Sequence, residues 1–173
     1  MYRDVLDILA CPKCGNDQAL DLEVSENFGE DVITGLLHCP SCDAQYPITN
    51  GIPRFVGSDA EDFGNFDFQW NKWSAIQIDR LSGHSLSEDR FLSDSRWDRE
   101  WIRGKRILDA GCGAGRFADV AASLGANVIA CDLSGAIDAC RRTTMVHGGR
   151  VTCIQSSIYD LPLRKGVFDA VYC

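Results

Sequence analysis

Two sets of residues in this chain have the types and spacing for chemistry. The first is Asp109-Ala110-Gly111-Cys112-Gly113-Ala114-Gly115, where a carboxylate precedes three alternate glycines. Because glycine has no Cβ, a ligand can lie against such a turn, facing the N–H groups of a following helix. A dinucleotide fingerprint would need its third glycine at Arg116, so the spacing indicates another ligand. An acid at this point suits a cationic ligand better than a pyrophosphate.

The second set is two C-x-x-C pairs, Cys11 with Cys14 and Cys39 with Cys42, separated by 24 residues. Each pair turns two thiolates toward one centre, and together the pairs complete a tetrahedral zinc site. Four thiolates leave no open position, so this zinc would be structural. The alternatives are two disulfides or a redox-active pair. Metal binding is favoured because a unit this small buries too little apolar area to fold readily alone.

The elements that position the glycines follow from apolar runs and turn signals. Strands are predicted at 106–110, 127–132, 151–155 and 168–173, with helices at 117–124 and from 135 to about 146. Strands that alternate with helices imply right-handed crossovers and a parallel sheet, here in the order 3-2-1-4. Asp132 ends the second strand, where a carboxylate can accept both ribose hydroxyls of an adenosine.

The sequence therefore predicts an α/β fold, a Rossmann-like parallel sheet preceded by a small zinc ribbon. The predicted domains are the ribbon (1–56), an aromatic-rich connector with lid helices (57–103) and the Rossmann-like domain (104–173). Loss of the ribbon is expected to leave the helices of the last domain largely intact. The aromatic run at 63–73 is interpreted as a packed amphipathic helix or a lid, and Ser85 with Glu88 as a capping box that starts a helix.

Composition narrows the class of protein. The net charge of −8 argues against nucleic acid as a partner. The sequence has no run of about 18 apolar residues, so no membrane span is expected. Acids interrupt the first apolar residues, which is unlike a signal peptide. Four of the nine cysteines form pairs and five are scattered, a pattern that indicates metal binding in a reducing, cytoplasmic setting.

The glycine run, Asp132 and two later segments, 155–163 and 168–171, resemble the motifs of class I S-adenosylmethionine-dependent methyltransferases. The resemblance implies S-adenosylmethionine as cofactor. It also implies site residues: Asp109 faces the methionine end, Gly111, Gly113 and Gly115 allow close approach, Asp132 and Leu133 meet the ribose, and Ser157 and Ile158 meet the adenine. Ser157 stands where the family has aspartate; Asp160 is an alternative acceptor. The sequence identifies no catalytic residue.

The ribbon carries a second resemblance. Residues 6–14 and 46–53 are similar to the zinc-ribbon family that includes the activator subunit of tRNA and protein methyltransferases. Residues 1–56 contain three basic and nine acidic residues, whereas a ribbon that holds RNA should be basic. A protein partner is therefore expected for the ribbon.

The function predicted is methyl transfer from S-adenosylmethionine to a small-molecule acceptor such as a lipid quinone, a sugar or a natural product. One alternative is a zinc-finger rRNA guanine methyltransferase, and another is a non-catalytic module that binds a partner.

By resemblance, a complete class I sheet has seven strands, and this chain ends within the fourth. The chain is therefore expected to be a truncated form that holds cofactor weakly and turns over no substrate by itself. Phe168, Val171 and Tyr172 would lack a covering helix, and the edge at 168–173 would self-associate.

Overall fold

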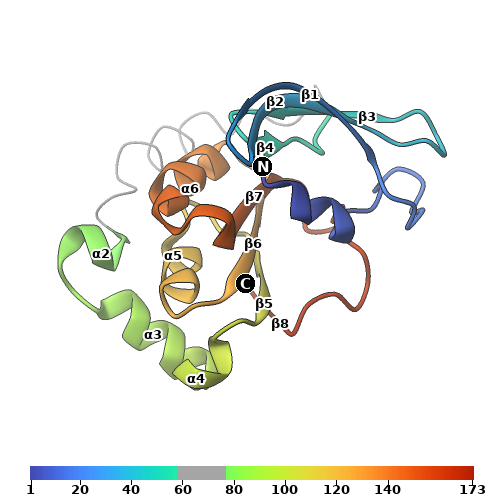
Figure 1. The fold of residues 1–173 in the computed structure, drawn as a ribbon. Helices are drawn as coiled ribbons and strands as arrows, with labels where there is room; N and C mark the ends of the chain where they lie inside the picture. Colours follow the sequence, from blue (N-terminus) through green and yellow to red (C-terminus); the bar gives the residue numbers. More distant parts are fainter. Residues whose placement is uncertain (58–76) are drawn as a thin grey trace.

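The computed structural model describes residues 1–57 and 77–173 and contains two four-stranded sheets (Figure 1). The first is antiparallel and follows the 3₁₀ helix η1 (Arg3–Ile8); its strands are β1 (Asp21–Phe28), β2 (Asp31–His38), β3 (Gln45–Thr49) and β4 (Ile52–Pro53). The second is parallel, with strands β5 (Arg106–Ala110), β6 (Asn127–Asp132), β7 (Val151–Gln155) and β8 (Ala170–Tyr172). Its helices are α2 (Asp79–Ser82), α3 (Leu86–Ser95), α4 (Arg99–Ile102), α5 (Arg116–Ser123), α6 (Ala136–Thr144) and the 3₁₀ helix η3 (Met145–Arg150).

The predicted α/β class and strand order are confirmed. The parallel sheet has the order β7-β6-β5-β8, which is the predicted 3-2-1-4, and β5, β6 and β7 occupy the predicted residues. The fourth strand is shorter than predicted, because only 170–172 pair with β5. The second helix also stops early, because 145–150 wind into the 3₁₀ helix η3. Across the described residues, every helix is too short or too polar to cross a lipid bilayer.

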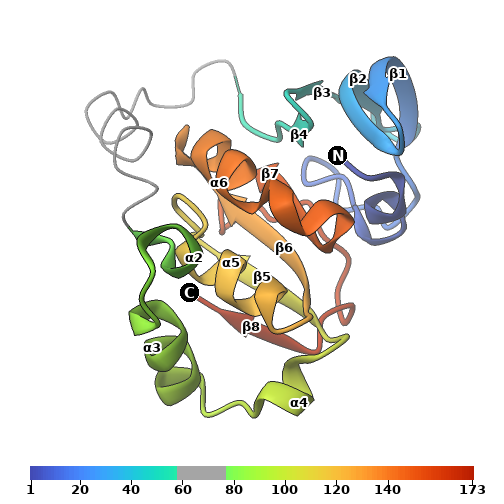
Figure 2. The same cartoon turned by 60° about the vertical axis from the view of Figure 1, so that its left-hand side comes forward.

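The parallel sheet is covered on both faces (Figure 1), and Figure 2 shows α5 and α6 lying over one of them. Side chains alternate along each strand, so Ile107 and Val128 pack toward α5 and α6 while Leu108 and Ile129 point the other way. Parallel sheets require such double coverage, since their strands are apolar on both faces. Here the second face is covered by residues 1–56, which we call the ribbon.

The ribbon and the parallel sheet share one hydrophobic cluster. Val5, Ile8 and Leu9 of the ribbon are buried with Leu108 of β5 and Ile154 of β7. Removing the ribbon would expose these strand residues to water. This packing therefore gives no support to the expectation that the helices of the second domain stay intact when the ribbon is lost.

Hydrogen bonds also join the ribbon to the parallel sheet and to α6. β4 leads into Arg54, which forms a parallel bridge with Gln155, and the Phe55 N–H donates to the Gln155 carbonyl at 2.8 Å. The Arg54 guanidinium donates to both carboxylate oxygens of Asp138 in α6, at 2.8 and 3.0 Å, and to Oε1 of Gln155 at 2.9 Å. The ribbon is thus joined to β7 and α6 by backbone and side-chain hydrogen bonds.

α3 starts where predicted, but the capping box predicted for Ser85 is wrong. The Ser85 hydroxyl donates to Asp89, whereas the carboxylate of Asp79, in α2, accepts the N–H groups of Ser87 and Glu88. α2 is anchored in turn on α5, since Asp119 accepts from Arg80 and contacts His147 Nε2 at 2.8 Å. The predicted aromatic element at 63–73 lies outside the described residues.

The expectation that the last strand lacks cover is wrong for two of its three residues. Tyr172 packs against Phe91 of α3 and Phe117 of α5, with ring centroids 5.2 and 6.4 Å away. Phe168 joins the cluster beneath the ribbon, whereas Val171 is 55% exposed. Only Val171 is therefore left as an apolar surface on this strand.

Replacing Arg54 tests the junction. Arg54→Ala removes hydrogen bonds to a charged partner, which typically contribute about 1.5–3 kcal/mol, and partial exposure of Asp138 favours the lower end. Urea unfolding followed by circular dichroism and by tryptophan fluorescence should give a single transition at a lower midpoint for the variant. Asp94→Ala, which breaks the exposed pair with Arg90, is the control and should change little. Two separate transitions in the wild type would contradict a shared core.

Candidate functional site

The glycine loop connects β5 to α5 and is tied to the neighbouring strand. The N–H groups of Gly111 and Cys112 both donate to the carbonyl of Cys131 in β6, at 2.8 and 3.0 Å. Gly111, Gly113 and Gly115 have φ values of 87°, 52° and 87°. This left-handed conformation is one that glycine adopts without a steric penalty. The loop geometry therefore depends on all three glycines.

The three glycines differ in what lies beside them. A Cβ built on Gly111 or Gly113 meets no atom of the described residues within 4 Å, so both positions border open space. A Cβ on Gly115 would lie 2.8 Å from Sγ of Cys140 and 3.2 Å from Oγ1 of Thr143. Gly111 and Gly113 therefore form a cradle open to a ligand, while Gly115 lets α5 pack closely on α6.

Asp132, at the end of β6, holds the far side of the cradle. Its Oδ2 accepts the Gly113 N–H at 2.8 Å, and its Oδ1 accepts from the N–H and hydroxyl of Ser134 at 2.9 and 2.7 Å. A carboxylate offers about four acceptor positions, so further donors can still bind here. The carboxylate is thus fixed in place with acceptor capacity to spare.

The segment after β7 lies beside Asp132. The Ser156 N–H donates to the Asp132 carbonyl at 3.0 Å, and Nε2 of Gln155 donates to the Leu133 carbonyl at 2.9 Å. Ser157 closes a tight turn, since its hydroxyl accepts the Tyr159 N–H at 3.2 Å. Ile158 is exposed on this turn. The predicted adenosine-facing residues therefore gather at the carboxyl ends of β6 and β7.

Asp109 is buried, and its carboxylate is only partly paired. Its side chain is 3% exposed, and among the described residues no group hydrogen-bonds its Oδ2. Burial raises the pKa of Asp109 to about 7; the Tyr172 hydroxyl and the Ala118 N–H oppose this rise, and the Asp132 carboxylate adds to it. Buried carboxylates are normally satisfied, so one with an unpaired oxygen beside an open cradle fits a cationic ligand group.

Tyr172 lies beside the predicted site, although the sequence analysis gave it no role there. Its hydroxyl is also buried, with no hydrogen-bond partner among the described residues. It stands directly beside Asp109, because the two residues are partners in the ladder of β5 and β8. The apolar pattern of the last strand indicated a strand but not its register, and the register alone brings this pair together.

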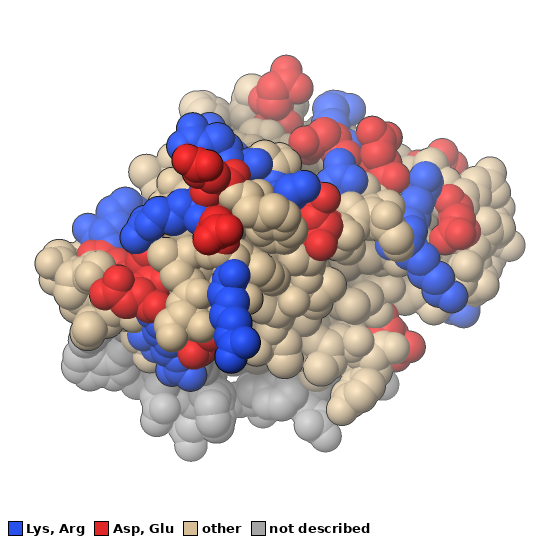
Figure 3. Space-filling model, turned by 90° about the horizontal axis from the view of Figure 1, so that it is seen from below, with Lys and Arg blue, Asp and Glu red and all other residues tan. Residues whose placement is uncertain are grey.

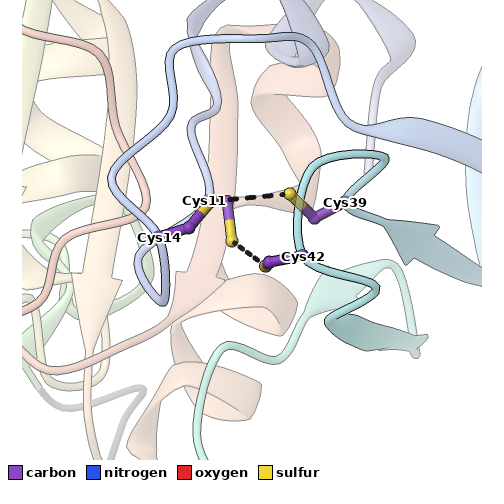
Figure 4. A group of neighbouring side chains, drawn as sticks. All are labelled: Cys11, Cys14, Cys39 and Cys42. Atoms are coloured by element: carbon purple, nitrogen blue, oxygen red, sulfur yellow. Dashed lines mark hydrogen bonds between the residues drawn. The ribbon is translucent and has the colours of Figure 1, made fainter.

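The four predicted metal-ligand cysteines lie together between two loops (Figure 4). All four sulfur atoms lie within 4.8 Å of one another; Cys11 and Cys42 are 3.6 Å apart, and Cys14 and Cys39 are 3.7 Å apart. A tetrahedral zinc with bonds of about 2.3 Å implies sulfur separations of about 3.8 Å. The donor set and its spacing therefore fit zinc. All nine cysteines are free of disulfide bonds, so the disulfide alternative is wrong.

Each cysteine pair lies in its own backbone turn, and the two turns have the same hydrogen-bond pattern. The Gly15 N–H donates to the Cys11 carbonyl and the Asp43 N–H to the Cys39 carbonyl, each at 2.9 Å. The Tyr46 hydroxyl approaches Sγ of Cys11 at 3.1 Å and closes one side of the cluster. Cys11 and Cys39 are buried, whereas Cys14 is exposed.

Comparison with known families matches both parts of the chain. Residues 107–173 match a family model described as a methyltransferase domain. Residues 3–51 match the family described as Trm112p-like protein.

Individual relatives are methyltransferases. The ribosomal protein L11 methyltransferase of Helicobacter hepaticus is 37% identical over 87 residues, or 47% of this chain and 26% of that protein. The ubiquinone biosynthesis O-methyltransferase of Methylocella silvestris is 32% identical over 129 residues, 65% of this chain and 50% of that protein. Its counterpart in Vibrio parahaemolyticus is 36% identical over 117 residues, 66% of this chain and 49% of that protein.

The chain thus spans about half the length of the two O-methyltransferases and about a quarter of the L11 methyltransferase. Its family matches, its parallel sheet and its four-cysteine cluster agree with one another. The chain carries a class I S-adenosylmethionine-dependent methyltransferase domain preceded by a Trm112p-like zinc ribbon.

Proposed function

We propose that this chain binds S-adenosylmethionine in the cradle beside Gly111 and Gly113, and that the protein transfers its methyl group to a small-molecule acceptor. One observation carries the cofactor part: an open glycine cradle lies next to a buried carboxylate whose Oδ2 has no hydrogen-bond partner among the described residues. The cofactor has a sulfonium and an ammonium, which are the cationic groups that such a carboxylate would stabilise.

Each predicted site residue has a role in this proposal. Asp109 faces the methionine end, and the N-terminus of α5 suits the methionine carboxylate. Asp132 and Leu133 border the ribose, while Ser157 and Ile158 border the adenine. Gly115 acts indirectly, through the close contact of α5 with α6.

The chemistry needs little proton transfer from the protein. When bound, the cofactor supplies an electrophilic methyl group on its sulfonium. The contribution of the chain is to hold and orient the cofactor, since methyl transfer depends mainly on alignment at near-attack distance. None of the residues proposed above acts as a general base.

A small-molecule acceptor is supported in two ways. Two of the relatives reported above are named ubiquinone biosynthesis O-methyltransferases. On the face drawn in Figure 3, Lys and Arg are interspersed with Asp and Glu, without the continuous basic surface that an RNA acceptor would favour. This view and the acidic ribbon argue against an rRNA acceptor.

We further infer that the protein partner of the ribbon is the methyltransferase domain of the same chain. The Ala10 N–H donates to the Pro162 carbonyl at 3.0 Å, and the Arg164 N–H donates to the Ile8 carbonyl at 2.8 Å. Both contacts join the segment before Cys11 to the segment that follows the adenine-facing turn. The ribbon would thus support the cofactor site from within the chain.

Asp132→Ala tests the ribose assignment. The variant removes charge-assisted hydrogen bonds, so affinity for S-adenosylhomocysteine should fall by about 1.5–3 kcal/mol, measured by titration calorimetry. Asp94→Ala is the control, because Asp94 is exposed and pairs only with Arg90 among the described residues. Equal affinity of Asp132→Ala and wild type would rule the assignment out.

The zinc assignment predicts one zinc per chain. Metal analysis should give this stoichiometry, and X-ray absorption should find only sulfur around the metal. Cys11→Ser should lose the metal and lower the melting temperature of the whole chain, because the ribbon shares its core with the parallel sheet. Cys173→Ser, at an exposed cysteine outside the cluster, should keep the full zinc content. Folded protein with less than one zinc, or nitrogen ligands, would contradict the assignment.

A further inference from the structure

Asp109 and Tyr172 form a side-by-side pair at the carboxyl end of the parallel sheet. They are ladder partners on β5 and β8, both on the face toward α5. Each carries a buried polar atom, Oδ2 of Asp109 and the hydroxyl of Tyr172, without a hydrogen-bond partner among the described residues. Two such atoms in one place are unusual in a folded protein.

The packing explains why the pair stays unsatisfied. The Tyr172 ring is held edge-on by Phe91 at 5.2 Å and lies within 6.4 Å of Phe117, so its hydroxyl cannot turn out to water. The Asp109 side chain lies beneath the start of α5, just before the open glycine cradle. The cradle, which borders open space, is therefore the side from which a cationic group would approach Asp109.

We propose that Tyr172 positions and tunes Asp109, the acceptor for the ammonium group of the cofactor, so that binding of this cation expels a proton from Asp109 to solvent. The proposal rests on the proposed function and extends it to a residue of β8. The proton balance is simple. At pH 7 the carboxyl group of the empty site is about half protonated, and the occupied site holds a carboxylate paired with the ammonium.

The groups around Asp109 agree with this assignment. Burial raises its pKa to about 7, and the Asp132 carboxylate on β6 pushes it further in the same direction. The Tyr172 hydroxyl lowers this pKa. The thiols of Cys112, Cys131 and Cys140 also lie near the pair. Burial raises the pKa of Cys112 and Cys131, and hydrogen bonding with Cys112 raises that of Cys140, so these thiols are neutral at pH 7. No basic side chain is among these groups.

The sign of the pH dependence follows. Below the pKa of Asp109, a proton must leave before the ammonium can pair, so affinity rises with pH and levels off above that pKa. Tyr172→Phe removes the group that lowers the pKa. The rise in affinity should therefore move to higher pH in this variant, while the phenyl ring still packs against Phe91.

The test is calorimetric titration of the full chain with S-adenosylhomocysteine, in phosphate and in Tris buffer, between pH 6 and 8.5. With a pKa of about 7, the wild type should release about half a proton per ligand at pH 7. Asp109→Asn should bind more weakly and release none. Tyr172→Phe should bind several-fold more weakly at pH 7 and approach the wild type at pH 8.5. Tyr2→Phe, at a tyrosine that packs on Gly149, is the control.

The outcomes separate the two proposals. Thermal melting first establishes that each variant is folded. A wild type that binds ligand without proton release, or a Tyr172→Phe profile that stays parallel to the wild type at every pH, overturns the role of Tyr172 and leaves the cofactor assignment standing. A wild type that does not bind S-adenosylhomocysteine overturns the proposed function, and this inference with it.

Discussion

The burial of the second face of the parallel sheet beneath the ribbon is the constraint on which the rest of the structure depends. α5 and α6 cover one face, and Val5, Ile8 and Leu9 of the ribbon cover the other. A parallel sheet with an open apolar face would not be stable in water. The ribbon is itself too small to fold readily without its metal, so the cysteine cluster indirectly supports the sheet that carries the cofactor site. The metal site and the glycine cradle therefore depend on the same hydrophobic packing between the ribbon and the parallel sheet.

The candidate site contains buried polar atoms that lower the stability of the empty protein. An unpaired buried carboxylate and an unpaired buried hydroxyl both cost free energy in the empty protein. The surrounding packing, with Tyr172 held by aromatic rings and Asp132 fixed by Gly113 and Ser134, keeps these groups in place. A preformed site of this kind loses little conformational freedom when a ligand binds.

Features set by local sequence were predictable, and features set by distant contacts were not. β5, β6 and β7 follow from short apolar runs, and the cysteine cluster follows from the spacing of its pairs. The cap of α3 by Asp79 could not be predicted, because the carboxylate arrives from another helix. The difference between Gly115 and the other two glycines was hidden for a similar reason: it depends on how closely α6 approaches. The sharing of a core between ribbon and sheet was also missed, since the apolar residues of each could equally have packed within their own domain.

The side chain of Gln155 has a consequence for sequence variation. Its Oε1 accepts from Arg54 of the ribbon, and its Nε2 donates to the carbonyl of Leu133. An amide supplies both an acceptor and a donor at that reach, and glutamate would lose the hydrogen bond to the Leu133 carbonyl. The requirement exists only where a ribbon arginine is present. Positions 54 and 155 are therefore expected to change together during evolution, and methyltransferases without a fused ribbon should be free to replace the glutamine.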